Sequence, residues 1–204
     1  MSKLVTHIRK RPHGVKRPKA TILLSGGVDS TTCLAYYIGE GYQVAALFID
    51  YGQASASKEK RAAKSVCRHF NVPLRTVRLA GTSKKGVGLI VARNAFLLLT
   101  AALESCAQSG IIALGIHAGT NYPDCSVSFV KRMQSIFDIY AGGAVQIGAP
   151  FLRWNKADIW AFATSQKIPL GLTYSCERGR SQPCGSCASC SDLEALRAGS
   201  NQQN

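Results

Sequence analysis

The chain has 204 residues, of which 46% are hydrophobic and 18% are charged. This length suits one domain with its own core, and the composition excludes a disordered protein. No apolar run approaches the ~20 residues that a membrane-spanning helix needs, and no secretory leader is recognised. We therefore expect a cytoplasmic protein without a membrane partner.

The net charge of +14 is unevenly distributed along the chain. Residues 1–20 contain seven lysines or arginines and no acid, and the glycine and prolines there discourage regular structure. We expect residues 1–19 to form a basic N-terminal arm. This arm is either a solvated segment or a contact for an acidic macromolecular partner, nucleic acid or protein, through charge attraction.

The first predicted element is a buried strand over residues 20–24, which breaks into the turn Ser25-Gly26-Gly27. A helix from Thr31 to Gly39 follows, with Asp29 or Ser30 as its expected cap. The N–H groups of the turn and the helix dipole point at one spot, which indicates an anion-binding cradle. The turn lacks the spacing and the lysine of a Walker A loop and the third glycine of a dinucleotide fingerprint.

The remaining elements alternate between strands and helices. We predict strands at 43–50, 74–79 and 111–116, and helices at 57–70, 94–109, 127–140 and 156–165, the last capped by Asn155. This order predicts an α/β fold with a parallel sheet and helices on both faces. The strand 74–79 alternates apolar and polar residues and should lie nearer an edge. Ser25, Asp50 and His117 should lie at the carboxyl ends of strands, where ligand loops gather.

Four of the eight cysteines are closely spaced near the end of the chain: Cys176, Cys184, Cys187 and Cys190. Two-residue gaps let successive thiolates turn onto one ion, and four thiolates in a reducing compartment suit structural Zn²⁺. An iron–sulfur cluster uses the same ligands and stays an alternative, whereas disulfides are disfavoured. We expect a small zinc-binding segment over 171–196 and a loose tail over 197–204. The thiols of Cys33, Cys67 and Cys106 are expected to be packed in the core.

The hexapeptide from Ser25 to Ser30 resembles the PP-loop of ATP pyrophosphatases. Three further motifs begin at Asp50, Ala92 and Tyr122 (Asp-Tyr-Gly-Gln, Ala-Arg-Asn and Tyr-Pro-Asp-Cys). Together with the four cysteines, they make residues 20–197 similar to the QueC family, the 7-cyano-7-deazaguanine synthases. The resemblance implies an adenine nucleotide α-hydrolase-like PP-loop domain over 20–170, and a homodimer is one expected assembly.

The resemblance also implies the reaction. With ATP and Mg²⁺, the carboxylate of 7-carboxy-7-deazaguanine is adenylated, ammonia displaces AMP to give an amide, and a second adenylation dehydrates the amide to a nitrile. AMP and pyrophosphate are released, which is the chemistry of a C–N ligase.

Roles for the site residues follow from this chemistry. We expect the pyrophosphate to be held by Ser25, Gly26, Gly27, Asp29 and Ser30, with Asp29 the residue most suited to contact Mg²⁺ or its water. Phe48 resembles the position that flanks adenine, and Tyr122 is suited to stack on the deazapurine ring. Asp124 could accept two hydrogen bonds from a guanine-like edge or cap its own turn. Arg93 and Lys156 would meet phosphate or carboxylate, or form salt bridges. His117 is a substrate contact or base, or a packed histidine that caps a turn.

Three departures from the family pattern leave the acceptor open. The segment before the Ala-Arg-Asn motif is short, the stretch 115–121 is short and lacks an acid, and the basic arm is not a family feature. A protein amine or a nucleic acid group could replace ammonia, and the product would then be an amide. A tRNA-modifying PP-loop adenylase and a non-enzymatic zinc module are further alternatives.

Overall fold

The computed structural model describes residues 17–81, 85–105 and 109–201 of the chain. Most of the predicted arm, part of the loop after residue 80, and Cys106 lie outside the described residues. The strands are β1 (Lys19–Leu23), β2 (Gln43–Asp50), β3 (Leu74–Arg78), β4 (Gly110–Ala113) and β5 (Val145–Gly148). The α-helices are α1 (Val28–Gly39), α2 (Ala56–Phe70), α3 (Arg93–Ser105), α4 (Val127–Ala141), α5 (Lys156–Ser165) and α6 (Ala188–Asn201).

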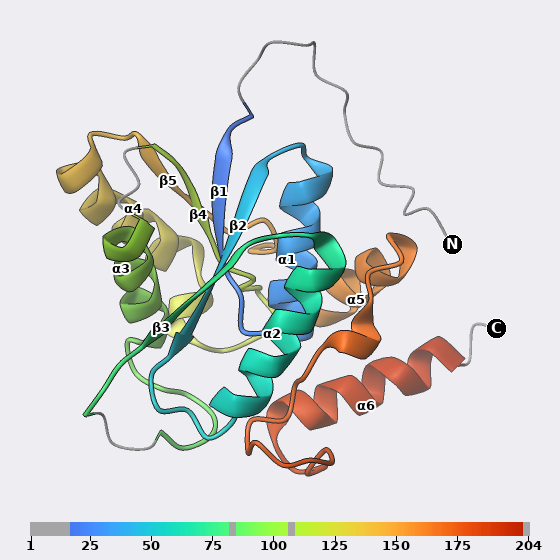
Figure 1. Cartoon of the computed structure of the whole chain (residues 1–204). Coiled ribbons are helices and arrows are strands. Elements are labelled where there is room, and N and C mark those ends of the chain that lie inside the picture. The colour runs from blue at the N-terminus through green and yellow to red at the C-terminus, as the bar shows by residue number, and fades with distance from the viewer. Residues whose placement is uncertain (1–16, 82–84, 106–108, 202–204) are drawn as a thin grey trace.

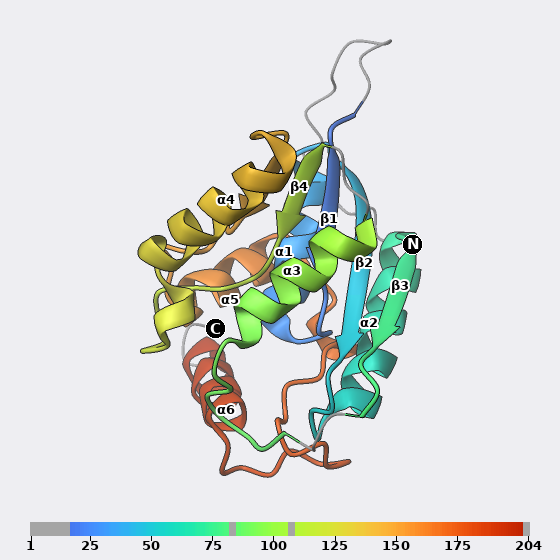
Figure 2. The same cartoon turned by 90° about the vertical axis from the view of Figure 1, so that its left-hand side faces the viewer.

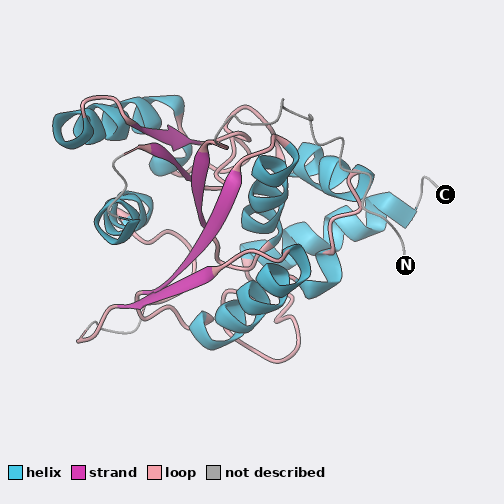
Figure 3. Ribbon diagram, turned by 45° about the horizontal axis from the view of Figure 1, so that its top comes forward, coloured by secondary structure: helices cyan, strands magenta, loops and turns pink. Residues whose placement is uncertain are grey.

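The five strands form one sheet in the order β3-β2-β1-β4-β5, and every neighbouring pair is parallel. Helices α1, α2 and α5 cover one face of the sheet, and α3 and α4 cover the other (Figures 1 and 3). The predicted α/β fold with helices on both faces is confirmed. Strand β3 lies at an edge, as its alternating pattern predicts.

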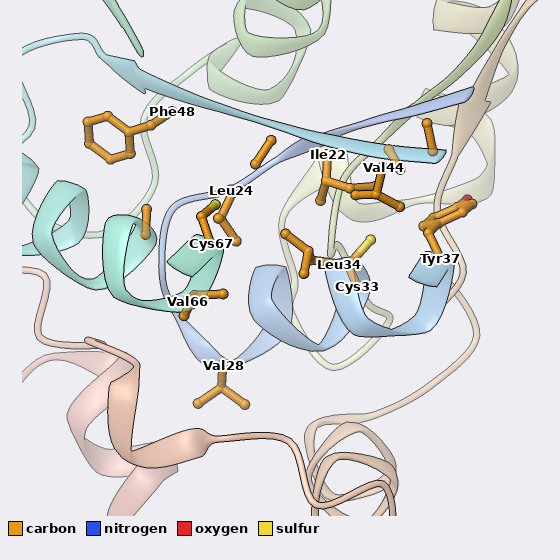
Figure 4. Packing of buried hydrophobic residues seen from close by; sticks show 14 of the residues in the cluster. Ile22, Leu24, Val28, Cys33, Leu34, Tyr37, Val44, Phe48, Val66 and Cys67 are labelled. Atoms are coloured by element: carbon orange, nitrogen blue, oxygen red, sulfur yellow. The ribbon is translucent and has the colours of Figure 1, made fainter. Parts of the chain in front are cut away.

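Alternation along the central strands divides the core into two clusters. Ile22 and Leu24 face α1 and α2, whereas Leu23 belongs to the cluster under α3 and α4. Figure 4 shows the first cluster, in which Leu34 of α1 packs beneath β1. The predicted packed thiols of Cys33 and Cys67 are buried there.

The strand order reverses beside β1, and this positions the site. The chain winds outward through β2 and β3, and then returns to place β4 on the other side of β1. The connections on the two sides of β1 therefore leave along opposite faces of the sheet, which opens a crevice at the carboxyl ends of β1 and β4. Figure 2 shows α6 across this end of the sheet, toward which the arrowheads point.

The cap of α1 differs from the prediction. The helix begins at Val28, and its N-cap is Gly27, without a side-chain cap hydrogen bond. Asp29 and Ser30 lie inside the first turn instead, so the expectation that either caps the helix was wrong. The cap of α5 is confirmed, because Asn155 Oδ1 accepts from Asp158 N at 2.9 Å and the Asp158 carboxylate accepts from Asn155 N.

Short or weakly patterned elements account for the other differences. Strand β5 has four residues and was not predicted, and β4 ends at Ala113 rather than at residue 116. Helix α3 is described as far as Ser105, and residues 106–108 of the predicted helix lie outside the described residues, whereas Ser109, its predicted end, is not helical. Helix α6 reaches Asn201, so the expectation of a loose tail was wrong through that residue. Within the described ranges, no helix is long and apolar enough to cross a membrane.

Candidate active site

The turn between β1 and α1 forms the cradle that the sequence predicts. Gly26 has φ +82°, and a Cβ there would lie 2.7 Å from Ala63 N and from Glu59 O of α2, so this position requires glycine. Ser25 Oγ lies 3.0 Å from Ser30 Oγ, and both hydroxyls flank the first turn of α1. The N–H groups of that turn have no partner within the helix, and the helix dipole favours negative charge there. The geometry therefore suits a phosphate group.

The end of β4 closes against the same turn through Gly115. A Cβ on Gly115 would lie 2.6 Å from Asp29 O and 3.0 Å from Ser30 N. Both atoms are backbone and cannot rotate away, so only glycine permits this approach. Sequence reasoning assigned no role to Gly115, although a glycine within an otherwise apolar run signals a close backbone approach.

Asp29 lies at the centre of the charged part of the site. Its Oδ2 atom is 2.6 Å from Lys156 Nζ and 3.9 Å from His117 Nε2. Its Oδ1 atom is buried and has no hydrogen-bond partner among the described residues. A buried carboxylate oxygen without a partner can bind a cation or accept a hydrogen bond. Asp29 Oδ1 is therefore chemically suited to Mg²⁺, which prefers oxygen ligands.

His117 is held in one orientation by its own turn. Its Nδ1 atom accepts a hydrogen bond from Gly119 N at 3.1 Å, so the neutral ring carries its proton on Nε2, which faces Asp29. Burial lowers the pKa of His117 below its ordinary value. The packed, turn-capping interpretation of His117 therefore describes its geometry, with Nε2 3.9 Å from Asp29 Oδ2, and its role as a substrate contact or base stays a prediction.

These groups surround one cavity of about 310 Å³, a size common for small-molecule sites. It brings together most of the residues that the sequence singled out: Ser25, Gly27, Asp29, Ser30, Phe48, Arg93, His117, Tyr122 and Lys156. Gly26 packs against α2 instead, as described above. Phe48 is only 1% exposed, because its ring also belongs to the core beneath α2 (Figure 4).

Asp124 does not line this cavity. Its Oδ2 atom accepts from Asn94 N at 3.3 Å, and Asn94 Nδ2 donates to Asp124 O at 3.3 Å. Both residues are buried, so Asp124 braces the first turn of α3. Its Oδ1 atom is buried and has no hydrogen-bond partner among the described residues. The expected hydrogen bonds from Asp124 to a guanine-like edge stay a prediction.

Arg93 follows a backbone outlier at the start of α3. Ala92 has φ +61°, a left-handed conformation that is uncommon for residues other than glycine. Arg93 Nε lies 3.4 Å from Asn94 Oδ1, and the guanidinium lines the cavity. No salt bridge of Arg93 is found within the described residues. Lys156, by contrast, forms an ion pair with Asp29, as its salt-bridge interpretation expects.

The four closely spaced cysteines converge as predicted. Their Sγ atoms all lie within 4.8 Å of one another. One tetrahedral Zn²⁺ with bonds of about 2.3 Å needs sulfurs about 3.8 Å apart, so the set fits a single ion. A four-iron cluster would spread the thiolates more widely, because each thiolate binds a different iron.

The cysteine segment also forms a wall of the cavity, which sequence reasoning missed. Tyr174 N donates to Gly26 O at 2.9 Å, which ties this segment to the cradle. Glu177 Oε2 accepts from Gly88 N at 3.0 Å, and Oε1 accepts from Ser189 Oγ at 2.8 Å and from Ser189 N. Burial alone would raise the pKa of Glu177, but these hydrogen bonds outweigh it and hold the pKa below its usual value. No motif marked Glu177, because its partners lie 89 and 12 residues away.

Glu59 of α2 fixes the loop after β2 by accepting hydrogen bonds from its side chains. Gln53 Nε2 donates to Ile49 O and to Glu59 Oε2, and Ser55 Oγ donates to Glu59 Oε1 at 2.7 Å. Burial raises the pKa of Glu59. Asp50 is the last residue of β2, as expected for the carboxyl end of a strand, and its carboxylate accepts from Gly52 N and lies 3.8 Å from Arg78 Nε. Gln53 and Glu59 line the cavity, so the Asp-Tyr-Gly-Gln motif forms part of its wall.

A parallel sheet with a glycine turn and an open helix N-terminus at its switch point is typical of nucleotide-binding proteins, and the hexapeptide from Ser25 to Ser30 makes this one the PP-loop type. The family model for "Queuosine biosynthesis protein QueC" matches residues 19–89 and 82–198. The chain therefore belongs to the QueC family, as its motifs predict.

Similar proteins agree with this assignment. The 7-cyano-7-deazaguanine synthase of Acetivibrio thermocellus is 33% identical over 84% of this chain and 89% of its own length. That of Picrophilus torridus is 31% identical over 84% of both chains. Among solved structures, the U34-tRNA thiolase NcsA from Methanococcus maripaludis, with its [4Fe-4S] cluster, aligns with a TM-score of 0.55 at 16% identity. The alignment covers 93% of this chain and 67% of the thiolase chain, and at this identity it shows a similar fold alone.

Proposed function

We propose that this chain is an AMP-forming ligase that converts 7-carboxy-7-deazaguanine to 7-cyano-7-deazaguanine at the expense of ATP. The observation that carries the proposal is the phosphate cradle, which shares one cavity with the Asp29–Lys156 pair and with Tyr122. Relatives at about 30% identity carry the name 7-cyano-7-deazaguanine synthase.

The cradle suits the β- and γ-phosphates of ATP. A carboxylate is a poor electrophile because it lacks a leaving group, and attack of its oxygen on the α-phosphorus supplies AMP as that group. Negative charge then grows on the departing pyrophosphate. The hydroxyls of Ser25 and Ser30 and the N–H groups of α1 meet that charge without reorganisation. Lys156 adds a cation to the same wall of the cavity.

Asp29 is the residue that would hold Mg²⁺, since its Oδ1 is buried and unpartnered within the described chain. Bound there, the ion would offset charge on the pyrophosphate. His117 directs its Nε2 proton toward the Asp29 carboxylate from 3.9 Å, and Lys156 donates to the same oxygen. Tyr122 and Arg93 also line the cavity, where Tyr122 would stack on the deazapurine ring and Arg93 would contact its carboxylate.

Ammonia completes the reaction in two stages. Its attack on the acyl carbon expels AMP and a proton and leaves an amide. Transfer of AMP from a second ATP to the amide oxygen releases pyrophosphate, and loss of AMP and of the two amide N–H protons then gives the nitrile. The four cysteines are proposed to bind structural Zn²⁺, since four protein ligands leave no open position. That ion would hold Tyr174 and Glu177 against the cavity.

The test measures AMP formed with 7-carboxy-7-deazaguanine, ammonium, ATP and magnesium. Ser25→Ala and Asp29→Asn should each lower kcat by on the order of 10²-fold or more, because they remove groups that stabilise the departing pyrophosphate. Ser135→Ala is the matched control, since its hydroxyl only donates to Lys131 O on the surface of α4. Full turnover by both site variants would contradict the PP-loop assignment.

A further inference from the structure

The outer face of α2 carries an unbroken stripe of positive charge. Arg61, Lys64 and Arg68 are exposed and follow a spacing of three and four residues, which places them on one side of the helix. The opposite side buries Ala63 and Val66 in the core. In Figure 1, α2 lies on the side of the sheet away from α3 and α4.

Nothing on α2 neutralises this stripe. The one acid of the helix, Glu59, turns inward and accepts hydrogen bonds from Gln53 and Ser55. Over the described ranges of the chain, no salt bridge involves Arg61, Lys64 or Arg68. Lys58 and Lys60 flank the stripe and add charge of the same sign.

The composition of this face favours phosphate over a protein surface. Protein interfaces depend on apolar and aromatic anchors. Within the described residues, the exposed large hydrophobic side chains lie on other elements, such as Leu103 of α3 and Ile139 of α4, and none lies on α2. Exposed Phe, Tyr and Trp rings are also absent from α2, and its one exposed aromatic ring, His69, packs edge-on against Phe70, so unpaired bases would find at most one ring to stack on.

We propose that Arg61, Lys64 and Arg68 dock the phosphate backbone of a double-helical nucleic acid without reading its sequence. The stripe spans about 10 Å of helix axis, and duplex DNA carries one charge per about 1.7 Å, so several phosphates lie within reach. This binding goes beyond the small-molecule reaction. The two share α2, because Glu59 on its inner side lines the cavity.

The experiment measures binding of the full chain to a fluorescent 20-base-pair DNA duplex by anisotropy between 50 and 200 mM salt. An RNA duplex, a single strand and a polyglutamate peptide are the other probes. The triple variant R61Q/K64Q/R68Q should reduce the slope of log K against log salt by about 2.7, since each lost phosphate contact removes about 0.9. Its AMP formation should stay at the wild-type level, since the three residues lie outside the cavity lining.

The matched control removes three exposed cations elsewhere, in K131Q/R132Q/R153Q, and should keep the wild-type slope. Deleting residues 1–16 from both triple variants separates the contribution of the basic arm. An equal reduction of the salt slope in the two triple variants would overturn the proposal. Absence of duplex binding by the wild-type chain at 50 mM salt would also overturn it, as would tighter binding of polyglutamate than of the duplex. Because binding is read without turnover, these outcomes are independent of whether the proposed reaction occurs.

Discussion

Replacement of Gly115 by alanine tests how closely the cradle is built. The added Cβ would lie 2.6 Å from Asp29 O and 2.7 Å from Asp29 C. Ordinary van der Waals contact begins near 3.4 Å, so the first turn of α1 or the end of β4 must move by about 0.8 Å. Either movement displaces the N–H groups and the serine hydroxyls that face the cavity.

Two magnitudes follow from this displacement. Overpacking costs about 1–3 kcal/mol, which for a chain of this size lowers Tm by roughly 2–12 °C. A misplacement of about 1 Å at a reacting centre costs on the order of 10²-fold in rate. Gly115→Ala should therefore stay folded at 25 °C while AMP formation falls by on the order of 10²-fold. Thermal unfolding and AMP release from the same preparation measure both effects.

Gly39→Ala is the control, because a Cβ at Gly39, at the far end of the same helix, meets nothing within 4 Å. Alanine there should stabilise the protein by about 0.5–1 kcal/mol and leave turnover unchanged. Wild-type turnover and Tm in Gly115→Ala would refute the claim that close packing of β4 on α1 shapes the phosphate site.

Three further substitutions probe other parts of the site. Cys187→Ser should remove about one zinc per chain by elemental analysis and lower Tm strongly, since structural zinc contributes on the order of 10–16 kcal/mol; full stability without metal would argue against a structural ion. Glu177→Ala should reduce the free energy of unfolding in urea by about 1.5–3 kcal/mol, because it strips the acceptor from Gly88 N and Ser189 N; an unchanged value would show that this contact is dispensable. The lowered pKa of His117 means that its neutral form stabilises the fold above about pH 6.5 and that this stabilisation is lost as pH falls through the folded pKa. His117→Gln should flatten that acid-side fall in urea stability curves, and an identical pH profile would contradict the assigned burial.

The sequence predicts what short segments determine by themselves. The turn from Ser25 to Gly27 between an apolar strand and a helix fixes the cradle, because glycine conformation and helix polarity are local properties. The cysteine spacing likewise brings Cys184, Cys187 and Cys190 together within one turn. The Asn155 cap is a local signal of the same kind, and its helix was predicted with the observed bounds.

Contacts between distant segments could not be read in this way. Glu177 reaches Gly88 across 89 residues, and Asp124 reaches Asn94 across 30, so neither contact leaves a spacing pattern. Strand β5 is too short to show periodicity, and it is recognised only by its pairing with β4. Helix α6 follows directly on a loop that the cysteines organise, which obscured its helical pattern.

The ratio of AMP to product tests the central claim most directly. The protein is incubated with ATP, magnesium, ¹⁵N-ammonium and a limiting amount of 7-carboxy-7-deazaguanine. All products are identified and quantified by mass spectrometry. The account predicts a nitrile that carries one ¹⁵N, with two AMP formed for each nitrile. One AMP for each amide, joined to a protein or nucleic acid acceptor, would contradict nitrile synthesis, and AMP formed only when tRNA is added would move the activity to RNA modification. No AMP formation that depends on the carboxylate would contradict the account as a whole.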